Sequence, residues 1–388
     1  MSNELSNFAA RLCFDPARPM PDHEFNELAL ELFGLQFKYN PAYRKICDGR
    51  RCAPDKIKHW RQIPAVPAAA FKELELSSIP PHERTTVFHS SGTTEQRPSR
   101  HFHHAESLGI YETSLWQWFF PNVLPDLRFA IYDLRTRSNS AIGNRQSAII
   151  LTPPPEQAPH SSLIHMFETV RRKLGVPPSG GRANAELQTF LGTVEADGGW
   201  SLNNDTILPA LSSNSEDPDA RPILLLGTAF SFVHLLDHLA ERNLRFPLPR
   251  GSRVMETGGY KNRSRWMPKT ELHGLITERL GVPSEDIICE YGMSELSSQA
   301  YDRKVRSQKS EVRTFQFPPW ARVQIISPET GREVTEGATG LIRVVDLANV
   351  FSVMAVQTED LGVRHGDGFE LLGRAQQAEA RGCSLMTA

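Results

Sequence analysis

Short apolar runs alternate with longer amphipathic stretches through the middle of the chain. Residues 223–226 form a continuous apolar run, which is typical of a strand buried on both faces. A tight turn at Gly227 and a helix over 229–242 are predicted to follow, and a second helix is predicted for 268–280. Two further short strands are predicted, at 253–255 and 287–288. This alternation predicts an α/β fold in which helices cover a sheet.

The two ends of the chain have different patterns. The first sixty residues are predicted to be helical, with Phe25, Leu28 and Phe33 on a broad apolar face. From Phe315 onward the pattern becomes β-rich, with a turn at 328–331. The sequence therefore predicts a helical lead-in, an α/β core and a β-rich region.

The composition argues against several classes of protein. The 388 residues carry a formal net charge of −2, which disfavours nucleic acid as the main partner. No apolar run approaches the ~20 residues of a membrane-spanning helix, and the N-terminus lacks the basic and apolar regions of a signal peptide. Five cysteines, an odd number without paired spacing, are typical of a reducing compartment. We therefore expect a cytoplasmic protein with no membrane span and no nucleic-acid partner.

A loop rich in hydroxyl side chains follows the β-branched run at 85–88. It consists of Ser90, Ser91, Gly92, Thr93 and Thr94. Gly92 lets the backbone bend, so the neighbouring hydroxyl and N–H groups can converge on an anion. Arg97 and Arg100 add the positive charge that a polyphosphate needs. The alternative is a surface turn, because Ser and Thr also occur in turns for purely local reasons.

Several common catalytic and metal-binding motifs are absent from the sequence. It contains no phosphate loop ending in GKS or GKT, no Gly-x-Gly-x-x-Gly, no HExxH and no Gly-x-Ser-x-Gly. His101, His103 and His104 cluster, but they lack the helical i, i+4 spacing with a third ligand. Cys47 and Cys52 have no second pair to complete a zinc site.

Three later segments carry chemistry that is compatible with the loop. Gly258 and Gly259 follow a strand, where a flat ring could lie against bare backbone. Ser294 places a hydroxyl beside the carboxylate of Glu295, a pair suited to a phosphate and its Mg²⁺. Asp360 in a turn could accept hydrogen bonds from two ribose hydroxyls. Each has a structural alternative as a strand-end turn, a helix cap or a turn former, but their joint order favours nucleotide binding.

In this order the segments resemble those of the acyl-adenylate-forming, AMP-producing ligases. The closest resemblance is to the acyl-protein synthetase family of bacterial bioluminescence, and it is carried by HSSGTTEQRPSR, ETGGYKNR, EYGMSELSSQAY, LANVFSVMAVQTEDLG and LLGRAQQAEARGCSL. These stretches cover most of the chain. The resemblance implies the large N-terminal domain of adenylate-forming enzymes, with helix-covered sheets and a β-rich subdomain, and it implies ATP and Mg²⁺ as cofactors.

The resemblance also implies a role for each matching residue. The triphosphate would contact Ser90, Ser91, Gly92, Thr93, Thr94 and Arg97. The adenine would contact Gly258, Gly259, Tyr291 and Gly292. The α-phosphate and Mg²⁺ would be handled by the catalytic residues Ser294 and Glu295, and the ribose by Asp360 and Arg374.

Three departures from the family pattern affect these expectations. The loop lacks the usual lysine and has Glu95 where a glycine is common, so Arg97 and Arg100 would supply the charge. Glu359 replaces the glycine often found before the ribose-binding aspartate. The sequence stops soon after Arg374, so we expect the C-terminal lid domain to be truncated, together with the catalytic lysine that it carries in larger ligases.

A cysteine near the end of the sequence is the candidate acyl carrier. Arg381 beside Cys383 would favour the thiolate, and Gly382 leaves room around it. In the bioluminescence synthetases a cysteine near the C-terminus carries the acyl group before transfer to a reductase. The resemblance at Arg-Gly-Cys-Ser-Leu implies that role for Cys383, and the alternative is an incidental cysteine in the tail.

The sequence thus predicts an enzyme that activates a carboxylic acid with ATP through acyl-AMP and transfers the acyl group to a thiol, on Cys383 or a partner protein. The alternatives are an acyl-coenzyme A or acyl-carrier-protein ligase without the Cys383 intermediate, and a non-catalytic nucleotide-binding subunit. The predicted regions are a helical lead-in at 1–85, an α/β nucleotide-binding core at 86–314, a β-rich subdomain at 315–372 and a tail at 373–388.

Overall fold

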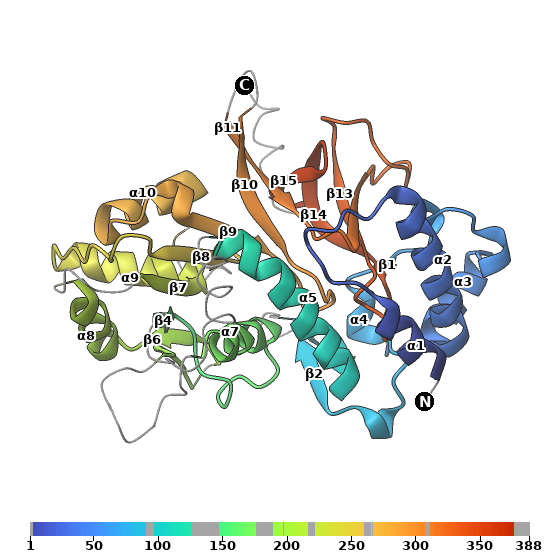
Figure 1. Ribbon diagram of the computed structural model, residues 1–388, viewed down its shortest axis with the longest axis horizontal. Helices are drawn as coiled ribbons and strands as arrows, with labels where there is room; N and C mark the ends of the chain where they lie inside the picture. Colours follow the sequence, from blue (N-terminus) through green and yellow to red (C-terminus); the bar gives the residue numbers. More distant parts are fainter. Residues whose placement is uncertain are drawn as a thin grey trace, which may run out of the picture. The chain divides into compact units, whose positions relative to one another are not determined.

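The chain divides into two compact units in a computed structural model, shown in Figure 1. Unit 1 comprises Met1–Trp118 and Gly292–Ala388, and unit 2 comprises Phe119–Tyr291. The structure describes residues 3–90, 97–125, 147–175, 189–196, 198–215, 222–259, 265, 267–306 and 311–375. The two units differ in architecture, because unit 2 contains a parallel sheet and unit 1 a mainly antiparallel one.

The parallel sheet of unit 2 confirms the predicted α/β class. Its strand order is β4 (Ser147–Ile150), β7 (Ile223–Thr228), β8 (Arg253–Thr257) and β9 (Ile287–Tyr291). Every residue of β7 and β9 is buried, as expected for strands covered on both faces. The register pairs Glu256 with Cys289 and Thr257 with Glu290, so these four residues share the carboxyl ends of two neighbouring strands.

Strand β7 is longer than predicted, because Gly227 continues the strand instead of forming a turn. A Cβ atom added at Gly227 would lie 3.1 Å from Leu151 Cβ and 3.1 Å from a ring carbon of Phe232. The glycine is therefore required by close packing rather than by a turn. Helix α9 (Ala229–Glu241) begins directly after Thr228, whose side chain caps its first turn.

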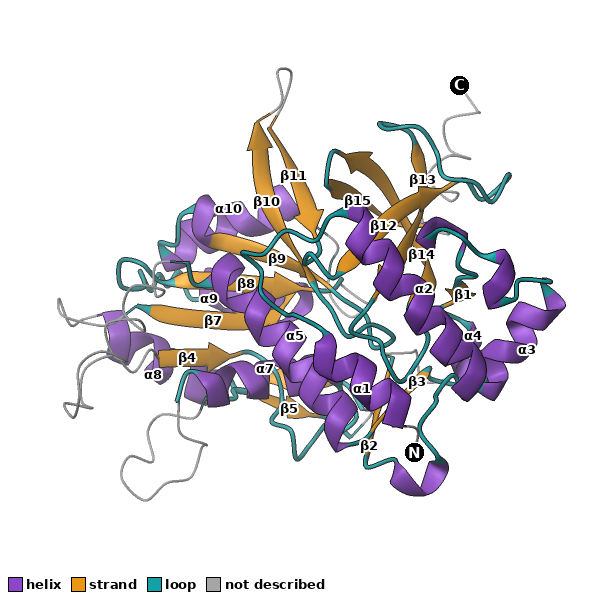
Figure 2. Cartoon of the chain, turned by 45° about the vertical axis from the view of Figure 1, so that its right-hand side comes forward, coloured by secondary structure: helices purple, strands orange, loops and turns teal. Residues whose placement is uncertain are grey.

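Helices flank the parallel sheet in Figures 1 and 2. They are α7 (Ser162–Lys173), α8 (Asn204–Ser215), α9 and α10 (Lys269–Leu280). One face of the sheet places Ile149, Val254 and Ile287 in a buried core with side chains of α8, α9 and α10. Helix α10 ends at Gly281, which has a φ of +67° and so adopts the left-handed conformation that favours glycine.

Smaller elements complete the described part of unit 2. Strands β5 (Gly192–Val194) and β6 (Trp200–Leu202) pair antiparallel, and the short 3₁₀ helix η4 (Ser284–Asp286) leads into β9. The apolar run at 129–132, whose pattern also predicts a buried strand, lies outside the described residues. The polar, acidic stretch at 212–222, whose composition predicts a linker, begins inside α8, and residues 216–221 lie outside the described part.

Unit 1 begins with helices α1 (Asn3–Arg11), α2 (Asp22–Tyr39) and α3 (Pro41–Gly49). Helix α2 buries Phe25, Leu32 and Phe33 on one face. Asn40 caps α3, because its side chain accepts a hydrogen bond from the amide of Tyr43 at 3.0 Å. Shorter helices follow: η1 (Pro54–Lys56), η2 (Trp60–Gln62), α4 (Ala70–Glu73) and η3 (Pro81–Glu83). Helix α5 (Ala105–Val123) starts in unit 1.

The sheet of unit 1 forms the predicted β-rich region. Its strand order is β12 (Ala321–Ile326), β13 (Thr339–Asp346), β14 (Ala355–His365), β15 (Gly368–Arg374), β11 (Glu311–Gln316) and β10 (Ala300–Arg306), and neighbours run antiparallel. Strand β1 (Val66–Pro67) pairs parallel with β14. A separate hairpin joins β2 (Thr86–His89) to β3 (Arg100–His103), and its loop contains the predicted phosphate-binding residues.

Candidate active site

The predicted phosphate loop connects β2 to β3 in unit 1. Two hydrogen bonds fix its base: the Ser90 amide donates to Ser99 O at 3.3 Å, and the Ser99 amide donates to Ser90 Oγ at 3.0 Å. The loop residues that lie outside the described part of the chain are Ser91, Gly92, Thr93 and Thr94. Ser90 is therefore held at the start of the loop by the opposite strand.

The arginines next to the loop are paired with glutamates. Arg97 Nη1 lies 3.8 Å from Glu73, and Arg100 Nη1 lies 3.6 Å from Glu75. Glu75 also pairs with Arg84 at 2.7 Å, and this guanidinium holds the pKa of Glu75 below its usual range. The Arg97 side chain is 54% exposed, so its ion pair with Glu73 is weak.

Ser294 and Glu295 are hydrogen-bonded to the β2–β3 hairpin. Ser294 Oγ donates to Glu295 Oε2 at 3.1 Å and lies 3.4 Å from Ser99 Oγ. His101 Nδ1 donates to the main-chain oxygen of Ser294 at 2.7 Å. Ser90, Ser99, Ser294 and Glu295 therefore form one connected polar group within unit 1, which we call the serine–glutamate cluster. Ser99 and His101 were not predicted as members of the site.

Burial controls the charges in the serine–glutamate cluster. Glu295 is only 5% exposed, and burial raises the pKa of its carboxyl, although the hydroxyls of Ser99 and Ser294 and the charge of Arg374 oppose the rise. Within the described residues no cationic side chain forms an ion pair with Glu295. Burial lowers the pKa of His101 to about 4, so its ring is neutral at pH 7 and donates from Nδ1.

The donor set of this cluster fits Mg²⁺. The ion is commonly held by one or two carboxylates together with the phosphates of a substrate. Glu295 offers such a carboxylate, which forms no ion pair with a described residue, and Ser294 adds a hydroxyl. Among the described residues no cluster of three or more acidic, histidine or cysteine side chains forms a separate metal site.

A buried polar network holds the main chain around Glu295. Asn349 Nδ2 donates to Glu295 O at 2.8 Å, and Ser297 Oγ donates to Asn349 Oδ1 at 2.6 Å. The carboxylate of Asp346 accepts from the amides of Ser297 at 3.0 Å and Ser298 at 2.8 Å. Burial raises the pKa of Asp346 to about 6 against these hydrogen bonds. Asp346 and Asn349 were not predicted from the sequence. The feature that could have identified them is that both are polar residues inside an otherwise apolar stretch.

The predicted ribose residues face each other across the β14–β15 hairpin. Asp360 is paired with Arg374 in the strand register, and Arg374 Nε lies 3.9 Å from Asp360 Oδ1. The Asp360 amide donates to Thr358 Oγ1 at 3.1 Å, which fixes the local backbone. Since Arg374 also lowers the pKa of Glu295, its charge acts on the serine–glutamate cluster.

Three of the four predicted adenine residues, Gly258, Gly259 and Tyr291, lie at or next to strand ends in unit 2. Gly258 follows β8 with a φ of +72°, and a Cβ atom added at Gly258 or Gly259 would meet no atom within 4 Å. Tyr291 ends the neighbouring strand β9 and is 7% exposed. The exposed Gly292 is the first residue of the second segment of unit 1. The expectation that these residues share one cleft with the serine–glutamate cluster stays a prediction.

A buried ion pair lies directly before the glycine pair. Glu256 is fully buried, and its carboxylate accepts from Lys269 Nζ at 2.7 Å and lies 3.4 Å from His273 Nε2. Burial by itself would raise the pKa of Glu256, but these two neighbours lower it to about 2. Lys269 Nζ also contacts the sulfur of Cys289 on β9. This group was not predicted from the sequence.

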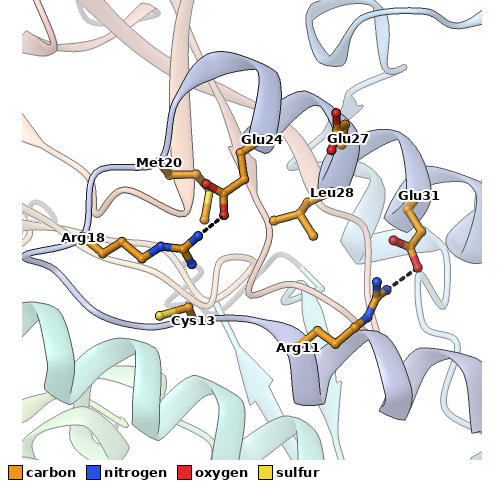
Figure 3. Close-up of a pocket in the computed structure, with 8 residues that line it drawn as sticks. All are labelled: Arg11, Cys13, Arg18, Met20, Glu24, Glu27, Leu28 and Glu31. Carbon is orange, nitrogen blue, oxygen red and sulfur yellow. Dashed lines mark hydrogen bonds and ion pairs between the residues drawn. The ribbon is translucent and has the colours of Figure 1, made fainter.

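The pocket drawn in Figure 3 is separate from all of these residues. It has a volume of about 320 Å³ and is lined by residues of α1, α2 and their connection, namely Arg11, Cys13, Arg18, Met20, Glu24, Glu27, Leu28 and Glu31. Its arginines are already paired, Arg11 with Glu31 and Arg18 with Glu24. None of the predicted site residues lines it. Among the described helices, none is long and apolar enough to cross a membrane.

Comparison with known proteins supports the class of protein predicted from the motifs. Residues 208–388 match the family model described as "Acyl-protein synthetase, LuxE". Two curated relatives are named long-chain-fatty-acid–luciferin-component ligase. The protein of Aliivibrio fischeri is 23% identical over 180 residues, which is 43% of this chain and 46% of the relative. The protein of Vibrio harveyi is 23% identical over 174 residues, which is 42% of this chain and 44% of the relative. The match thus spans about half the length of each relative.

Solved structures share the fold over nearly the whole chain. 2-Hydroxyisobutyryl-CoA ligase in its postadenylation state with 2-HIB-AMP has a TM-score of 0.61 at 13% identity, over 92% of this chain and 69% of that one. The same ligase with R3-HIB-AMP has a TM-score of 0.60 at 13% identity, over 94% and 72% of the two chains.

The chain therefore has the fold of the adenylate-forming ligases, which confirms the predicted fold class. Within that class, residues 208–388 carry the sequence pattern of the acyl-protein synthetases. The resemblance predicted from the motifs is thus confirmed for the fold and for the sequence pattern of residues 208–388.

Proposed function

We propose that the protein joins a carboxylic acid to AMP, using ATP as co-substrate, and passes the acyl group to a thiol. The observation that carries the proposal is the serine–glutamate cluster, where hydroxyl groups and a carboxylate that forms no ion pair with a described residue adjoin the predicted phosphate loop. The family match over residues 208–388 and the relatives named as fatty-acid ligases support the same chemistry.

In the first step an oxygen of the acid bonds to the α-phosphorus of ATP. The bond from that phosphorus to the pyrophosphate oxygen breaks, which gives acyl-AMP and pyrophosphate. Ser90 and Ser294 would donate hydrogen bonds to phosphate oxygens, where negative charge gathers. Mg²⁺ held by Glu295 would offset part of that charge. Neutral His101 and Asn349 would keep Ser294 and Glu295 in position through their main-chain oxygens.

Other residues would hold the nucleoside and keep the intermediate from water. Asp360 would accept hydrogen bonds from the ribose hydroxyls, next to Arg374. The bare backbone at Gly258 and Gly259 would leave room for the adenine ring. Because acyl-AMP is a reactive mixed anhydride, exclusion of water matters as much as orientation.

In the second step a thiol sulfur bonds to the acyl carbon, AMP leaves, and the thiol proton passes to solvent. Cys383 is the acceptor that the sequence resemblance supports, and it lies outside the described residues. A reductase, an acyl-carrier protein or coenzyme A would then receive the acyl group, or would replace Cys383 as the acceptor.

The test uses the full chain with ATP, Mg²⁺ and a panel of carboxylic acids. We expect acid-dependent release of pyrophosphate and a gain of acyl mass on the protein, measured by intact-mass spectrometry. Cys383→Ala should abolish the mass gain and keep the release. Acylation of coenzyme A or a carrier protein, without a mass gain on the chain, would reassign the acceptor. ATP binding without release for any acid would contradict catalysis.

A further inference from the structure

Helix α3 ends in a turn that brings two cysteines together. The amide of Cys52 donates to Cys47 O at 3.0 Å, and the amide of Arg51 donates to Asp48 O at 3.0 Å. Arg51 has a φ of +56°, so it adopts the left-handed conformation that closes such a turn. The two nested hydrogen bonds and the left-handed residue define a Schellman motif, which is a common end of a helix.

The motif limits the distance between the two cysteines. With standard bond lengths, the hydrogen bond from the Cys52 amide to Cys47 O leaves their Cα atoms no more than about 7 Å apart. Disulfides form up to about this Cα separation. In a Schellman motif the side chains at these same two positions commonly contact each other. The end of α3 therefore places the two thiols within reach of a bond.

The two thiols differ in their access to solvent. Cys47 is fully buried, and burial raises the pKa of its thiol to about 11, although a hydrogen bond to Tyr43 opposes the rise. The neighbouring charge of Cys52 adds to the rise, as expected for two thiols that lie close together. Cys52 is partly exposed, and its sulfur lies 3.3 Å from Arg50 O. An oxidant therefore reaches Cys52 first and finds the Cys47 thiol next to it.

The other described cysteines lie elsewhere in the fold. Cys13 lines the pocket drawn in Figure 3, and Cys289 on β9 of unit 2 contacts Lys269. All four described cysteines are free thiols in the structure. Cys13 therefore offers a control for reactions of a partly exposed thiol outside the turn.

We propose that Cys47 and Cys52 form a reversible disulfide when the protein meets a peroxide. The Cys52 thiolate attacks one oxygen of hydrogen peroxide, the O–O bond breaks, and a sulfenic acid and hydroxide result. The Cys47 sulfur then bonds to the Cys52 sulfur, and the sulfenic hydroxyl leaves as water with the Cys47 proton. The two thiols lose two electrons, and the peroxide gains them.

The bridge would hold the end of α3 together. Arg50 Nη1 donates to Ala65 O at 2.8 Å, and Tyr43 Oη donates to Pro64 O at 2.8 Å, so this helix also holds the segment before β1. A covalent link across the turn removes conformations that the open turn can reach. We therefore expect slower amide hydrogen exchange in this turn in the oxidised protein than in the reduced one.

The test treats the full chain with a small excess of hydrogen peroxide, blocks the remaining thiols by alkylation and digests the protein with trypsin without reduction. Trypsin cuts between the two cysteines, after Arg50 and Arg51. The bridge should therefore join peptides 46–50 and 52–56 into one species that dithiothreitol separates. Cys52→Ser should abolish this species, whereas Cys13→Ser should leave its yield unchanged.

Two variants of Arg51 test whether the turn pairs the thiols. Arg51→Gly suits the left-handed conformation, whereas Arg51→Val places a β-branched side chain in it. Both variants lose the same charge, so they differ mainly in how well they keep the turn. We expect the bridge to form about five- to thirtyfold more slowly in Arg51→Val than in Arg51→Gly.

Other products would overturn the proposal. Sulfinic acid or a mixed disulfide at Cys52 without the linked peptides would show that Cys47 does not react with it. A link from either residue to a different cysteine would also contradict the pairing. Equal rates in Arg51→Gly and Arg51→Val would show that the turn does not bring the thiols together. None of these outcomes bears on the proposed ligase function.

Discussion

Glu256 of unit 2 and Glu295 of unit 1 are both buried acids, and their buried charge is compensated differently. In unit 2, Glu256 is neutralised inside the protein by Lys269 and His273, and its pKa falls to about 2. In unit 1, burial keeps the pKa of Glu295 raised against hydroxyl and backbone hydrogen bonds and the charge of Arg374, and Glu295 forms no ion pair with any described residue. The first acid is part of the fold, whereas the second is the one that we propose receives a cation from outside. Burial alone does not distinguish the two acids, but the source of the counter-charge does.

The largest effect is expected from Glu295→Gln. If this carboxylate positions Mg²⁺ and phosphates, its loss should lower acid-dependent pyrophosphate release by about a hundred- to a thousandfold, the range found for single electrostatic groups in active sites. The unfolding temperature should stay level or rise slightly, because the glutamine amide is uncharged and folding no longer has to bury a charge at this position. Glu370→Gln is the matched control, an exposed acid of the same unit. A large loss of stability with activity retained would make Glu295 structural.

Lys269→Met should mainly lower stability, which is the opposite of the effect expected for Glu295→Gln. Removing one partner of a buried pair costs about 3–5 kcal/mol, and we expect the lower end because the Lys269 side chain is 40% exposed. Thermal and urea unfolding measure the loss. Arg245→Ala is the control, because its pair with Glu278 is exposed on both sides and should change stability by less than about 1 kcal/mol. Equal effects of the two variants would show that the buried pair of Glu256 contributes no more to stability than an exposed pair does.

The pH dependence of stability separates Glu290 from Glu256. The pKa of Glu290 rises from its usual 4.5 to about 7 on folding, so its neutral form stabilises the folded state below pH 4.5 and this contribution is lost as the pH rises through 7. At about 1.4 kcal/mol per pKa unit, Glu290→Gln should gain roughly 3 kcal/mol relative to the parent protein above pH 7. Unfolding free energies across this range test the sign. If the unfolding free energies of Glu290→Gln and of the parent protein had the same pH dependence, this would contradict a raised pKa of Glu290.

Asn349→Ala tests whether the uncharged side chain of Asn349 holds the main chain at Glu295 in position. The change would leave Glu295 O and Ser297 Oγ without their amide partner in a buried region. The expected loss is about 1–3 kcal/mol, the cost of leaving buried polar groups unpaired. Activity should fall more than this loss explains, because the main chain at Glu295 shifts. Asn349→Gln cannot restore the geometry, so rescue by that variant would argue against positioning.

The smallest structural effect is expected at Gly259. A methyl group there would meet no protein atom within 4 Å, so Gly259→Ala should change stability by no more than about 0.5 kcal/mol. If the adenine lies against this backbone, the affinity for ATP should nevertheless fall, which calorimetry would measure. An unchanged affinity for ATP would show that the adenine does not lie against Gly259. The adjoining Gly258→Ala is a poor substitute, because the φ of +72° adds backbone strain.

Much of the fold followed from local patterns. The continuous apolar run at 223–226 and the helical spacing of 229–242 identified β7 and α9, because burial on both faces leaves a readable signature. The prediction failed at Gly227, where contact with Leu151 and Phe232, and not a turn, requires the glycine. Local sequence cannot distinguish these two reasons for a glycine.

The candidate site was predictable only where neighbouring residues act together. Ser294 and Glu295 are adjacent in sequence and are hydrogen-bonded in the structure, as their pairing suggested. His101, Asp346 and Asn349 escaped prediction, since each contacts this turn across a long separation in the chain. Sequence alone does not show which distant residues will make such contacts. The hydrogen bond of Glu290 likewise comes from Thr257, on a strand more than thirty residues away.

The network that holds Glu295 also constrains when the turn can form. Its main chain is secured by Asp346 and Asn349, which enter the chain about fifty residues later. The entropy of closing that loop must be overcome before any of these hydrogen bonds exists. A nascent chain that has not yet emerged beyond Asn349 therefore lacks the hydrogen bonds that hold the turn at Glu295, so this turn is completed only after β13 and Asn349 have been synthesised.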